Sequence, residues 1–474
     1  MQTESKNVKF AVIADPHYYS EKLGITGRAY ELRNESDQKL LAESGAVLRA
    51  ALEELTESDV SFIIIAGDVS NDGEAVSHEE FREILRSYGS KKPFYLITAT
   101  HDWCCDGNPR RYDGDNVFND VPVLKPEELR DYYSEFGPDS AISEFLTDEG
   151  ATSYCLRPAE GITFLCLNDD RNGEGGSGYA ENHLEWIRSE CKKAQERGDT
   201  VYATEHHHLL LTPLDRLISG SGSVRYKEEM TGKLADAGIK IIFTGHSHMQ
   251  HITKLTSPNG NSIYEINVAA ISGYPSPIAY CTAYSNALDI DVSHLKGFTY
   301  KGEHYTAEYI KNHALNLFVK VVNAAVDNRP DEFVALVAAI GMSKENALKK
   351  WKLARFGLKK LNKATVRSTA RLINTFTFGR GINSRAAKGC GDVRVLDIVL
   401  DLFLSILDGG INKHTEDEPY YTVVKDAVSL PLRAVNALHI KNNGLKRTLT
   451  YLANTGVQAL RGGDIDANHA HLTY

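Results

Sequence analysis

Short motifs rich in Asp and His end five of the apolar runs in this sequence. Each follows β-branched or aromatic residues, as in FAVIA or IIFT. The five motifs are Asp15-Pro16-His17, Gly67-Asp68, Thr100-His101-Asp102, His206-His207-His208 and Gly245-His246-Ser247-His248. Carboxylate oxygens and imidazole nitrogens are common ligands of divalent metal ions. The motifs therefore predict a metal site, provided that the fold brings them together.

The elements that carry these motifs predict an α/β fold. From Val8 to about Ala270, short β-rich runs alternate with helical patterns, as expected for buried strands covered by helices. In open α/β sheets, ligands bind beyond the carboxyl ends of the strands. One His after a strand is more often a structural cap. The ordered set of five motifs, each after an apolar run, favours the metal site.

Length and composition indicate a globular protein with two domains. The chain has 474 residues, of which 42% are hydrophobic and 24% charged, and this length exceeds one typical domain. No apolar run reaches the ~20 residues of a membrane helix, so we expect no transmembrane segment. The polar start shows no secretory signal, and the seven unevenly spaced cysteines do not form a disulfide framework. We therefore expect a cytoplasmic protein.

The sequence changes character near residue 305. Helical periodicity dominates from there to the end, which predicts a catalytic domain over residues 1–305 and a helical domain over residues 306–474. The charge divides as well: residues 1–300 contain 28 Lys and Arg against 47 Asp and Glu, and residues 301–474 contain 25 against 16. The first part is acidic and the second basic, so we expect different electrostatic roles.

The order DxH, GD, HD, H and GHxH resembles that of the calcineurin-like metallophosphoesterase superfamily, over about residues 8–250. The resemblance implies an α/β fold in which two sheets pack face to face, flanked by helices, around two divalent ions (Mn, Fe, Zn, Mg or Ca). It also implies hydrolysis of phosphate esters by a metal-activated water. The sequence is most similar to cyclic nucleotide phosphodiesterase-like members, some of which add a C-terminal helical domain. A phosphodiesterase acting on cyclic nucleotides or nucleotide-like diesters is therefore expected. A phosphomonoesterase, a nuclease and a non-catalytic metal-binding scaffold are the alternatives.

The resemblance also assigns the metal ligands. The first ion takes Asp15, His17, Asp68 and His248. The second takes Asp68 as a bridge, with His206, His246 and the position of Thr100. Two ions that share a carboxylate lower the pKa of a water between them.

Further residues are expected to act on the substrate, a small phosphate ester rather than a nucleic acid. His101 can stabilise developing charge or protonate the leaving oxygen, with Asp102 available to orient it. Asn71, in the loop after Asp68, and His207 are expected to lie beside the substrate. His207 is also the alternative to His206 as a ligand, and the family pattern favours His206.

Thr100 departs from the family pattern. The family usually has Gly-Asn-His-Asp or Glu where this chain has Ala99-Thr100-His101-Asp102. A neutral Thr hydroxyl is shorter than the Asn side chain and a poorer donor than its amide oxygen. Thr100 can ligate weakly, a water can replace it, or the second ion can be absent.

A basic segment in the helical region is a second feature of the sequence. Between Ser343 and Lys388 there are 13 Lys or Arg and one acid, Glu345. Trp351, Leu353, Phe356, Leu361 and Val366 lie among them at roughly helical spacing, which indicates helices that pack on a core and expose a solvated basic face. The functional alternatives are steering of an anionic substrate, a nucleic-acid contact or an anionic membrane surface. Among these we rank steering first and the membrane last.

Overall fold

The computed structural model describes residues 7–170, 177–210, 227–339, 343–410 and 414–474. They divide into two compact units. The first contains the described residues of 7–314 together with residues 465–474, and the second contains those of 315–464. Among the described residues, none of the helices is long and apolar enough to cross a membrane.

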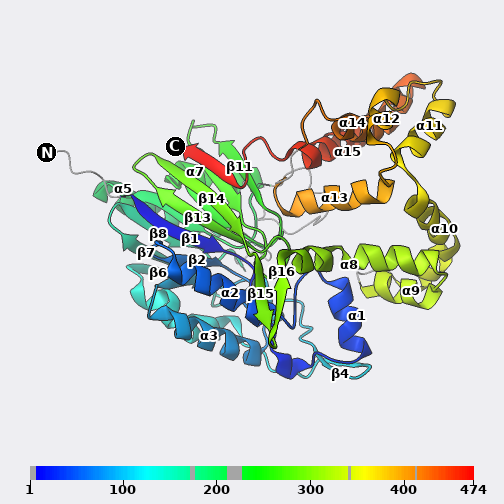
Figure 1. The fold of residues 1–474 in the computed structure, drawn as a ribbon. Coiled ribbons are helices and arrows are strands. Elements are labelled where there is room, and N and C mark those ends of the chain that lie inside the picture. The colour runs from blue at the N-terminus through cyan, green and yellow to red at the C-terminus, as the bar shows by residue number, and fades with distance from the viewer. Residues whose placement is uncertain (1–6, 171–176, 211–226, 340–342, 411–413) are drawn as a thin grey trace. The chain divides into compact units, whose positions relative to one another are not determined.

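Two mixed sheets form the centre of the first unit (Figure 1). The first sheet has the strand order β17 (His469–Thr473), β14 (Ala287–His294), β13 (Pro277–Ala283), β1 (Val8–Ile13), β2 (Ile63–Ala66) and β3 (Phe94–Ile97). In this sheet β1, β2 and β3 run parallel, and β13 pairs antiparallel with β1. The second sheet has the order β11 (His251–Thr256), β12 (Ser262–Asn267), β10 (Ile241–Thr244), β9 (Thr200–Thr204), β8 (Ile162–Cys166), β7 (Thr152–Ala159) and β6 (Ser143–Leu146). In it β8, β9, β10 and β12 run parallel.

Successive side chains of a strand point to opposite faces of its sheet, and in both sheets the side chains on both faces are largely apolar. Phe10 and Ile64 from the first sheet share one buried core with Phe164, Tyr202 and Phe243 from the second. The opposite faces of both sheets are also apolar, and helices cover them. Helices α2 (Ser44–Glu57) and α3 (Ala75–Gly89) pack on the first sheet, and α5 (Glu181–Arg197) and α7 (Lys227–Ala237) pack on the second. The predicted two-sheet sandwich flanked by helices is confirmed.

Smaller elements connect the sheets. They are η1 (Glu21–Leu23), α1 (Arg28–Ser36), η2 (Thr100–Trp103), β4 (Arg111–Asp113), β5 (Asn116–Phe118), α4 (Pro126–Tyr132), η3 (Ser134–Phe136), η4 (Pro138–Ser140), β15 (Gly297–Tyr300) and β16 (Glu303–Thr306). Helix α8 (Ala307–Val326) begins in the first unit and continues into the second.

The second unit is helical, as predicted. It continues with α9 (Pro330–Ala339), α10 (Lys344–Lys363), α11 (Val366–Phe376), α12 (Ser384–Cys390), α13 (Val395–Leu407), α14 (Pro419–Ala437) and α15 (Asn443–Arg461). The chain then returns to the first sheet, where β17 pairs antiparallel with β14. The sequence pattern did not reveal this return. The predicted division into residues 1–305 and 306–474 stays a prediction.

Candidate metal centre

The candidate residues lie just beyond the carboxyl ends of parallel strands. Asp15 and His17 follow β1, and Asp68 follows β2. On the second sheet, His206 follows β9, and His246 follows β10. Because the strands within each pair run parallel, their carboxyl ends meet at one edge of the sheet. Side chains from both sheets meet there.

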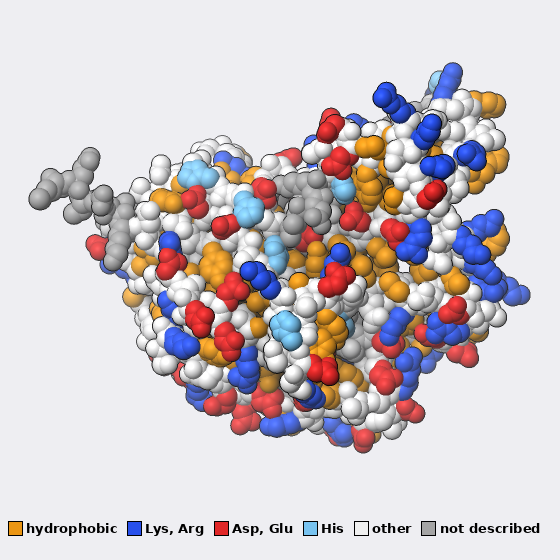
Figure 2. Space-filling model, viewed as in Figure 1, with side chains coloured by type: hydrophobic (Ala, Val, Ile, Leu, Met, Phe, Trp, Pro, Cys, Tyr) orange, Lys and Arg blue, Asp and Glu red, His pale blue; other side chains and the backbone are white. Residues whose placement is uncertain are grey.

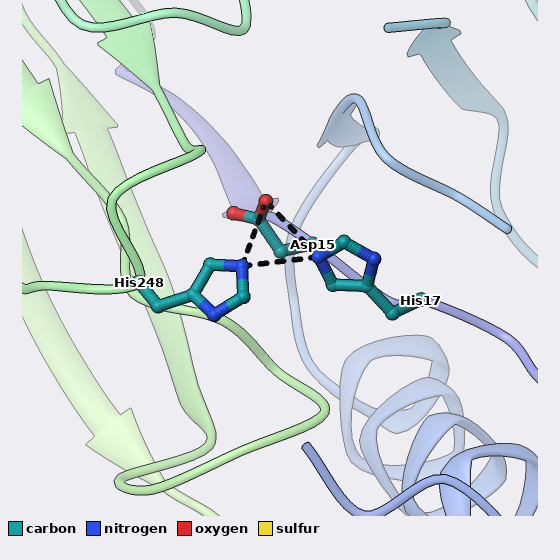
Figure 3. Close-up of side chains that lie close together, drawn as sticks. All are labelled: Asp15, His17 and His248. Carbon is teal, nitrogen blue, oxygen red and sulfur yellow. Dashed lines mark hydrogen bonds and ion pairs between the residues drawn. The ribbon is translucent and has the colours of Figure 1, made fainter. Parts of the chain in front are cut away.

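One group of side chains is formed by Asp15, His17 and His248 (Figure 3). The two Nε2 atoms of the histidines lie 3.0 Å apart. Oδ1 of Asp15 lies 3.7 Å from Nε2 of His17 and 3.5 Å from Nε2 of His248. Two nitrogens that bind one ion at 2.0–2.1 Å lie roughly 3.0–3.4 Å apart. The three donors therefore converge as ligands of one divalent ion do, and they fit such an ion.

Asp68 connects this group to a second one. Its Oδ2 lies 3.8 Å from Nε2 of His17 and 2.9 Å from Nε2 of His206. Donor atoms of Asp68, His206 and His246 lie within 4.8 Å of one another. Nδ1 of His206 donates to the carbonyl of Ala66 at 2.9 Å, which leaves Nε2 free to bind a metal. The carboxylate of Asp68 thus stands between two sets of imidazoles, where a bridging ligand would stand.

Two glycines allow this close approach. A Cβ at Gly67 would lie 2.7 Å from Nδ1 of His206, and a Cβ at Gly245 would lie 2.5 Å from Oδ2 of Asp15. Any larger residue at either position would displace a candidate ligand. The glycines that precede Asp68 and His246 in the sequence are therefore part of the site.

The backbone at the site is strained. Among the described residues, eleven other than glycine have positive φ. Five of them are candidate ligands: Asp15 (51°), His17 (41°), Asp68 (48°), His246 (69°) and His248 (56°). Such conformations cost about 1–3 kcal/mol each and cluster at functional sites, where the surrounding structure enforces them. This clustering is an indication of function that is independent of the residue types.

His101 lies at this edge on η2, and its backbone N–H donates to Oδ1 of Asp68 at 3.1 Å. We expected Asp102 to orient its ring, and this expectation is wrong. Asp102 accepts hydrogen bonds from Ser70 and from the Ala99 N–H instead. A helical turn directs successive side chains to different sides, so Asp102 braces the loop. The His101 Nδ1 contacts the carbonyl of Asn71 and lies 3.4 Å from Oδ1 of Asp72.

Charge around His101 favours its protonated form. Burial alone lowers the pKa of His101, but the carboxylates of Asp68 and Asp72 outweigh burial and raise it. Burial opposes ionisation of Asp72, yet its bond to His101 and the charge of Arg110 lower its pKa to about 2. Arg110 donates to Oδ2 of Asp72 at 2.8 Å. The chain from Arg110 through Asp72 to His101 therefore holds the imidazole and stabilises its proton.

The other predicted residues are also near this edge. His207 donates from Nδ1 to Oδ2 of Asp169 at 2.8 Å, and its ring centre lies 4.4 Å from that of His246. The histidine beside Asp68 is therefore His206, whose Nε2 lies 2.9 Å from Oδ2 of Asp68, and not His207. Asn71 is buried, and its side-chain oxygen has no hydrogen-bond partner among the described residues. Thr100 is half-buried at the start of η2, and within the described part of the chain its hydroxyl makes no hydrogen bond to a candidate ligand.

Sequence reasoning missed two residues that position these histidines. The side-chain amide of Gln38 lies 2.7 Å from Nδ1 of His248, and no pattern around Gln38 marks it. Asp169 accepts from His207 and, at 3.4 Å, from the backbone N–H of His206. Asp169 follows the apolar run TFLCLN and β8. Its place after a parallel strand could have identified it.

The model of the calcineurin-like phosphoesterase family matches residues 8–250. Serine/threonine-protein phosphatase CPPED1 of Bos taurus is 23% identical over 246 residues, which are 50% of this chain and 67% of the relative.

Among solved structures, the chain is similar to a dimetal phosphatase from Danio rerio, with 13% identity and a TM-score of 0.42. That match covers 60% of this chain and 96% of the other. A putative 5'-nucleotidase from Staphylococcus aureus matches with 13% identity and a TM-score of 0.33, over 67% of this chain and 59% of the other.

Proposed function

Because the chain belongs to the calcineurin-like phosphoesterase family, we propose that it hydrolyses phosphodiesters, with cyclic nucleotides or nucleotide-like diesters as the substrate class. One observation carries the catalytic part of this proposal. Oδ2 of Asp68 lies within 4 Å of Nε2 of both His17 and His206, between two groups of potential metal ligands. The choice of diesters is supported by the resemblance to cyclic nucleotide phosphodiesterase-like proteins with a C-terminal helical domain.

The residues divide between two metal sites. Asp15, His17, Asp68 and His248 would hold the first ion, and Asp68, His206 and His246 would hold the second, with Thr100 as a weak further ligand. Two ions bound there would polarise the phosphoryl group and supply a nucleophilic water near neutral pH. Asp15, His17, Asp68 and His206 are buried, whereas His246 and His248 are half-buried. Second contacts anchor several of these ligands, such as the bond from His206 to the Ala66 carbonyl. Such anchoring keeps their geometry fixed when substrate binds.

His101 is the proposed proton donor. Its Nδ1 is engaged by the Asn71 carbonyl and Asp72, so Nε2 is the atom that can donate a proton to the leaving oxygen. This donation matters most for alkoxide leaving groups, such as the ribose oxygen of a cyclic nucleotide, because they are poor leaving groups without a proton. Asp72 and Arg110 hold the imidazole in place. His207 and Asn71 are proposed to line the substrate site.

Phosphomonoester hydrolysis is the second candidate. It is favoured by the relative from Bos taurus, which is named a serine/threonine-protein phosphatase. A protein phosphatase acts on phosphorylated side chains, which are monoesters. The same metal site and proton donor serve both reactions, so the walls of the substrate site decide between them.

A substrate screen with defined metals tests both candidates. The metal-free chain is reconstituted with Mn, Fe, Zn, Mg or Ca and offered aryl monoesters, a bis-aryl diester, cyclic nucleotides, a phosphopeptide and single-stranded DNA. We expect metal-dependent turnover, with kcat/KM higher for cyclic nucleotides than for monoesters. The reverse order would establish a phosphomonoesterase, and preferred cleavage of DNA would establish a nuclease. No turnover with any metal, despite bound metal, would overturn the proposal in favour of a non-catalytic scaffold.

A further inference from the structure

Helix α10 exposes large apolar side chains among its cations. Its packed side carries Ala347 and Trp351, which contact Phe333 of α9 and its neighbours. Leu353 and Phe356 do not share that side: Leu353 is 77% exposed, and Phe356 is exposed as well. The sequence pattern assigned both residues to the core, and this assignment is wrong. The outer side of α10 is therefore not a purely polar, solvated face.

The neighbouring helix α11 extends the same surface. Leu372 is exposed, Phe376 is 77% exposed, and Phe378 just beyond the helix is 94% exposed. An open groove of about 940 Å³ lies between α10 and α11. Phe356, Leu361 and Leu372 line it together with Lys352, Lys359 and Lys360. We call the exposed residues of α10 and α11, with Phe378, the basic–apolar face.

The cations of this face are largely unneutralised. Of the 13 Lys and Arg between Ser343 and Lys388, two have a carboxylate within 4.0 Å in the part of the chain that is described. They are Lys349, paired with Glu345, and Arg367, paired with Asp392. Figure 2 shows Lys and Arg side chains gathered, with apolar side chains between them, on the helices of the second unit. The charge of this face is complementary to that of an anionic partner.

The mixture of residue types distinguishes the classes of anionic partner. Protein interfaces concentrate apolar side chains at their centre and are depleted of Lys, whereas here Lys and apolar side chains alternate. Single-stranded nucleic acid stacks its bases on aromatic rings, so binding of nucleic acid would not explain why Leu348 and Leu353 are exposed. A lipid surface uses both kinds of residue, because apolar side chains enter the acyl region while Lys stems extend to the phosphates.

We propose that the basic–apolar face binds the surface of an anionic lipid bilayer. Leu353, Phe356 and Phe376 insert below the headgroups, and Lys359, Lys360 and Lys363 contact lipid phosphates. Exposed apolar surface on a monomer commonly marks such an interaction site. This inference does not depend on the proposed hydrolytic reaction.

Vesicle binding by the full chain tests the proposal. We measure co-sedimentation with vesicles of phosphatidylcholine alone and of phosphatidylcholine with 30% phosphatidylglycerol. We expect binding to the anionic vesicles only, and weaker binding at 0.5 M salt. Each Lys near an anionic surface contributes roughly a factor of five, so Lys359→Glu/Lys360→Glu should weaken binding by about 30-fold or more. Leu353→Ser/Phe356→Ser should weaken it at least about tenfold.

Matched variants on the first unit serve as controls. Ile142→Ser/Leu146→Ser removes two exposed apolar side chains, and Lys91→Glu/Lys192→Glu reverses two exposed cations. We expect both to bind vesicles like wild type, and circular dichroism checks the folding of every variant. Three results would overturn the proposal. The first is binding that is equal for the two kinds of vesicle, or absent for both. The second is binding of single-stranded DNA but not of vesicles, where the face variants abolish the DNA binding. The third is a concentration-dependent dimer that does not bind vesicles and that Leu353→Ser/Phe356→Ser dissociates.

Discussion

The side-chain nitrogen Nε2 of Gln38 lies 2.7 Å from Nδ1 of His248, and the other nitrogen of that imidazole faces Asp15 and His17. The oxygen and nitrogen of a glutamine amide exchange places by rotation of the amide. After this rotation the oxygen faces His248, accepts the Nδ1 proton and would leave Nε2 of His248 free for a metal. Gln38 is thus placed to act on the proposed first metal site through His248.

We expect Gln38→Ala to weaken metal binding at the first site by about 10- to 100-fold, the usual effect of removing a partner of a ligating histidine. Isothermal titration of the metal-free chain measures the affinity. Gln38→Glu should restore tight binding, because a carboxylate also accepts the Nδ1 proton. Gln195→Ala on the surface of α5 is the matched control and should bind metal like wild type. Unchanged affinity in Gln38→Ala would show that His248 is oriented without Gln38.

Asp68 is expected to be indispensable for both ions. Asp68→Asn removes one negative charge next to His17 and His206 at once, so it should abolish binding of the second ion, weaken that of the first and eliminate nearly all turnover. Elemental analysis and turnover of an aryl diester provide the measurements. Asp59→Asn, at an exposed carboxylate paired with Lys9, is the control. Residual activity above about a tenth of wild type would contradict a bridging role.

His101 is expected to act on the chemistry rather than on metal binding. His101→Ala should retain the metal content and lose on the order of 10²–10⁴ in kcat, the range for a positioned general acid. The loss should be smaller for aryl leaving groups, which need less protonation. An equal loss for all leaving groups would indicate electrostatic stabilisation instead.

The two carboxylates near His101 should behave differently. Asp72→Asn should lower kcat with little effect on metal content, because it removes the charge that lies 3.4 Å from the His101 ring. Asp102→Asn should chiefly lower the free energy of unfolding, by about 1–3 kcal/mol, because a buried oxygen that accepts a backbone N–H is replaced by an amide donor. Kinetics and denaturant unfolding separate the two effects. Equal kinetic losses without loss of stability would return the orienting role to Asp102.

Thr100 is proposed as a weak ligand of the second ion, so that ion is expected to bind less tightly than the first. If its hydroxyl is a weak ligand, metal titration should show two steps, with activity following the weaker one. Thr100→Asn supplies the amide oxygen usual in the family and should allow activity at lower metal concentration. Thr100→Val removes the oxygen at nearly constant volume. If Thr100→Val has unchanged metal stoichiometry and turnover, Thr100 is not a ligand.

The sequence alone predicted the edge of the fold where the candidate ligands lie. Each of the runs FAVIA, FIIIAG and IIFT is a buried strand followed by Asp or His, and parallel strands bring such ends together whatever their separation in the chain. The local sequence also distinguished the two-sheet region from the helical region, because the spacing of apolar residues involves only positions close together in the chain. Because each follows a strand that ends at this edge, Asp15, Asp68 and His246 could be predicted to meet. The cytoplasmic location inferred from composition stays a prediction.

Only the tertiary structure decided which side chains hold the ligands in place. Gln38 and Asp72 lie in loops whose paths depend on packing between distant elements, and no local pattern encodes those paths. Asp102 follows His101 directly, yet the turn of η2 directs it towards Ser70. The return of β17 to the first sheet and the exposure of Leu353 depend likewise on which surfaces other segments cover. Hydrophobic periodicity reports that a side chain can be buried, whereas burial itself requires a neighbour that only the folded chain provides.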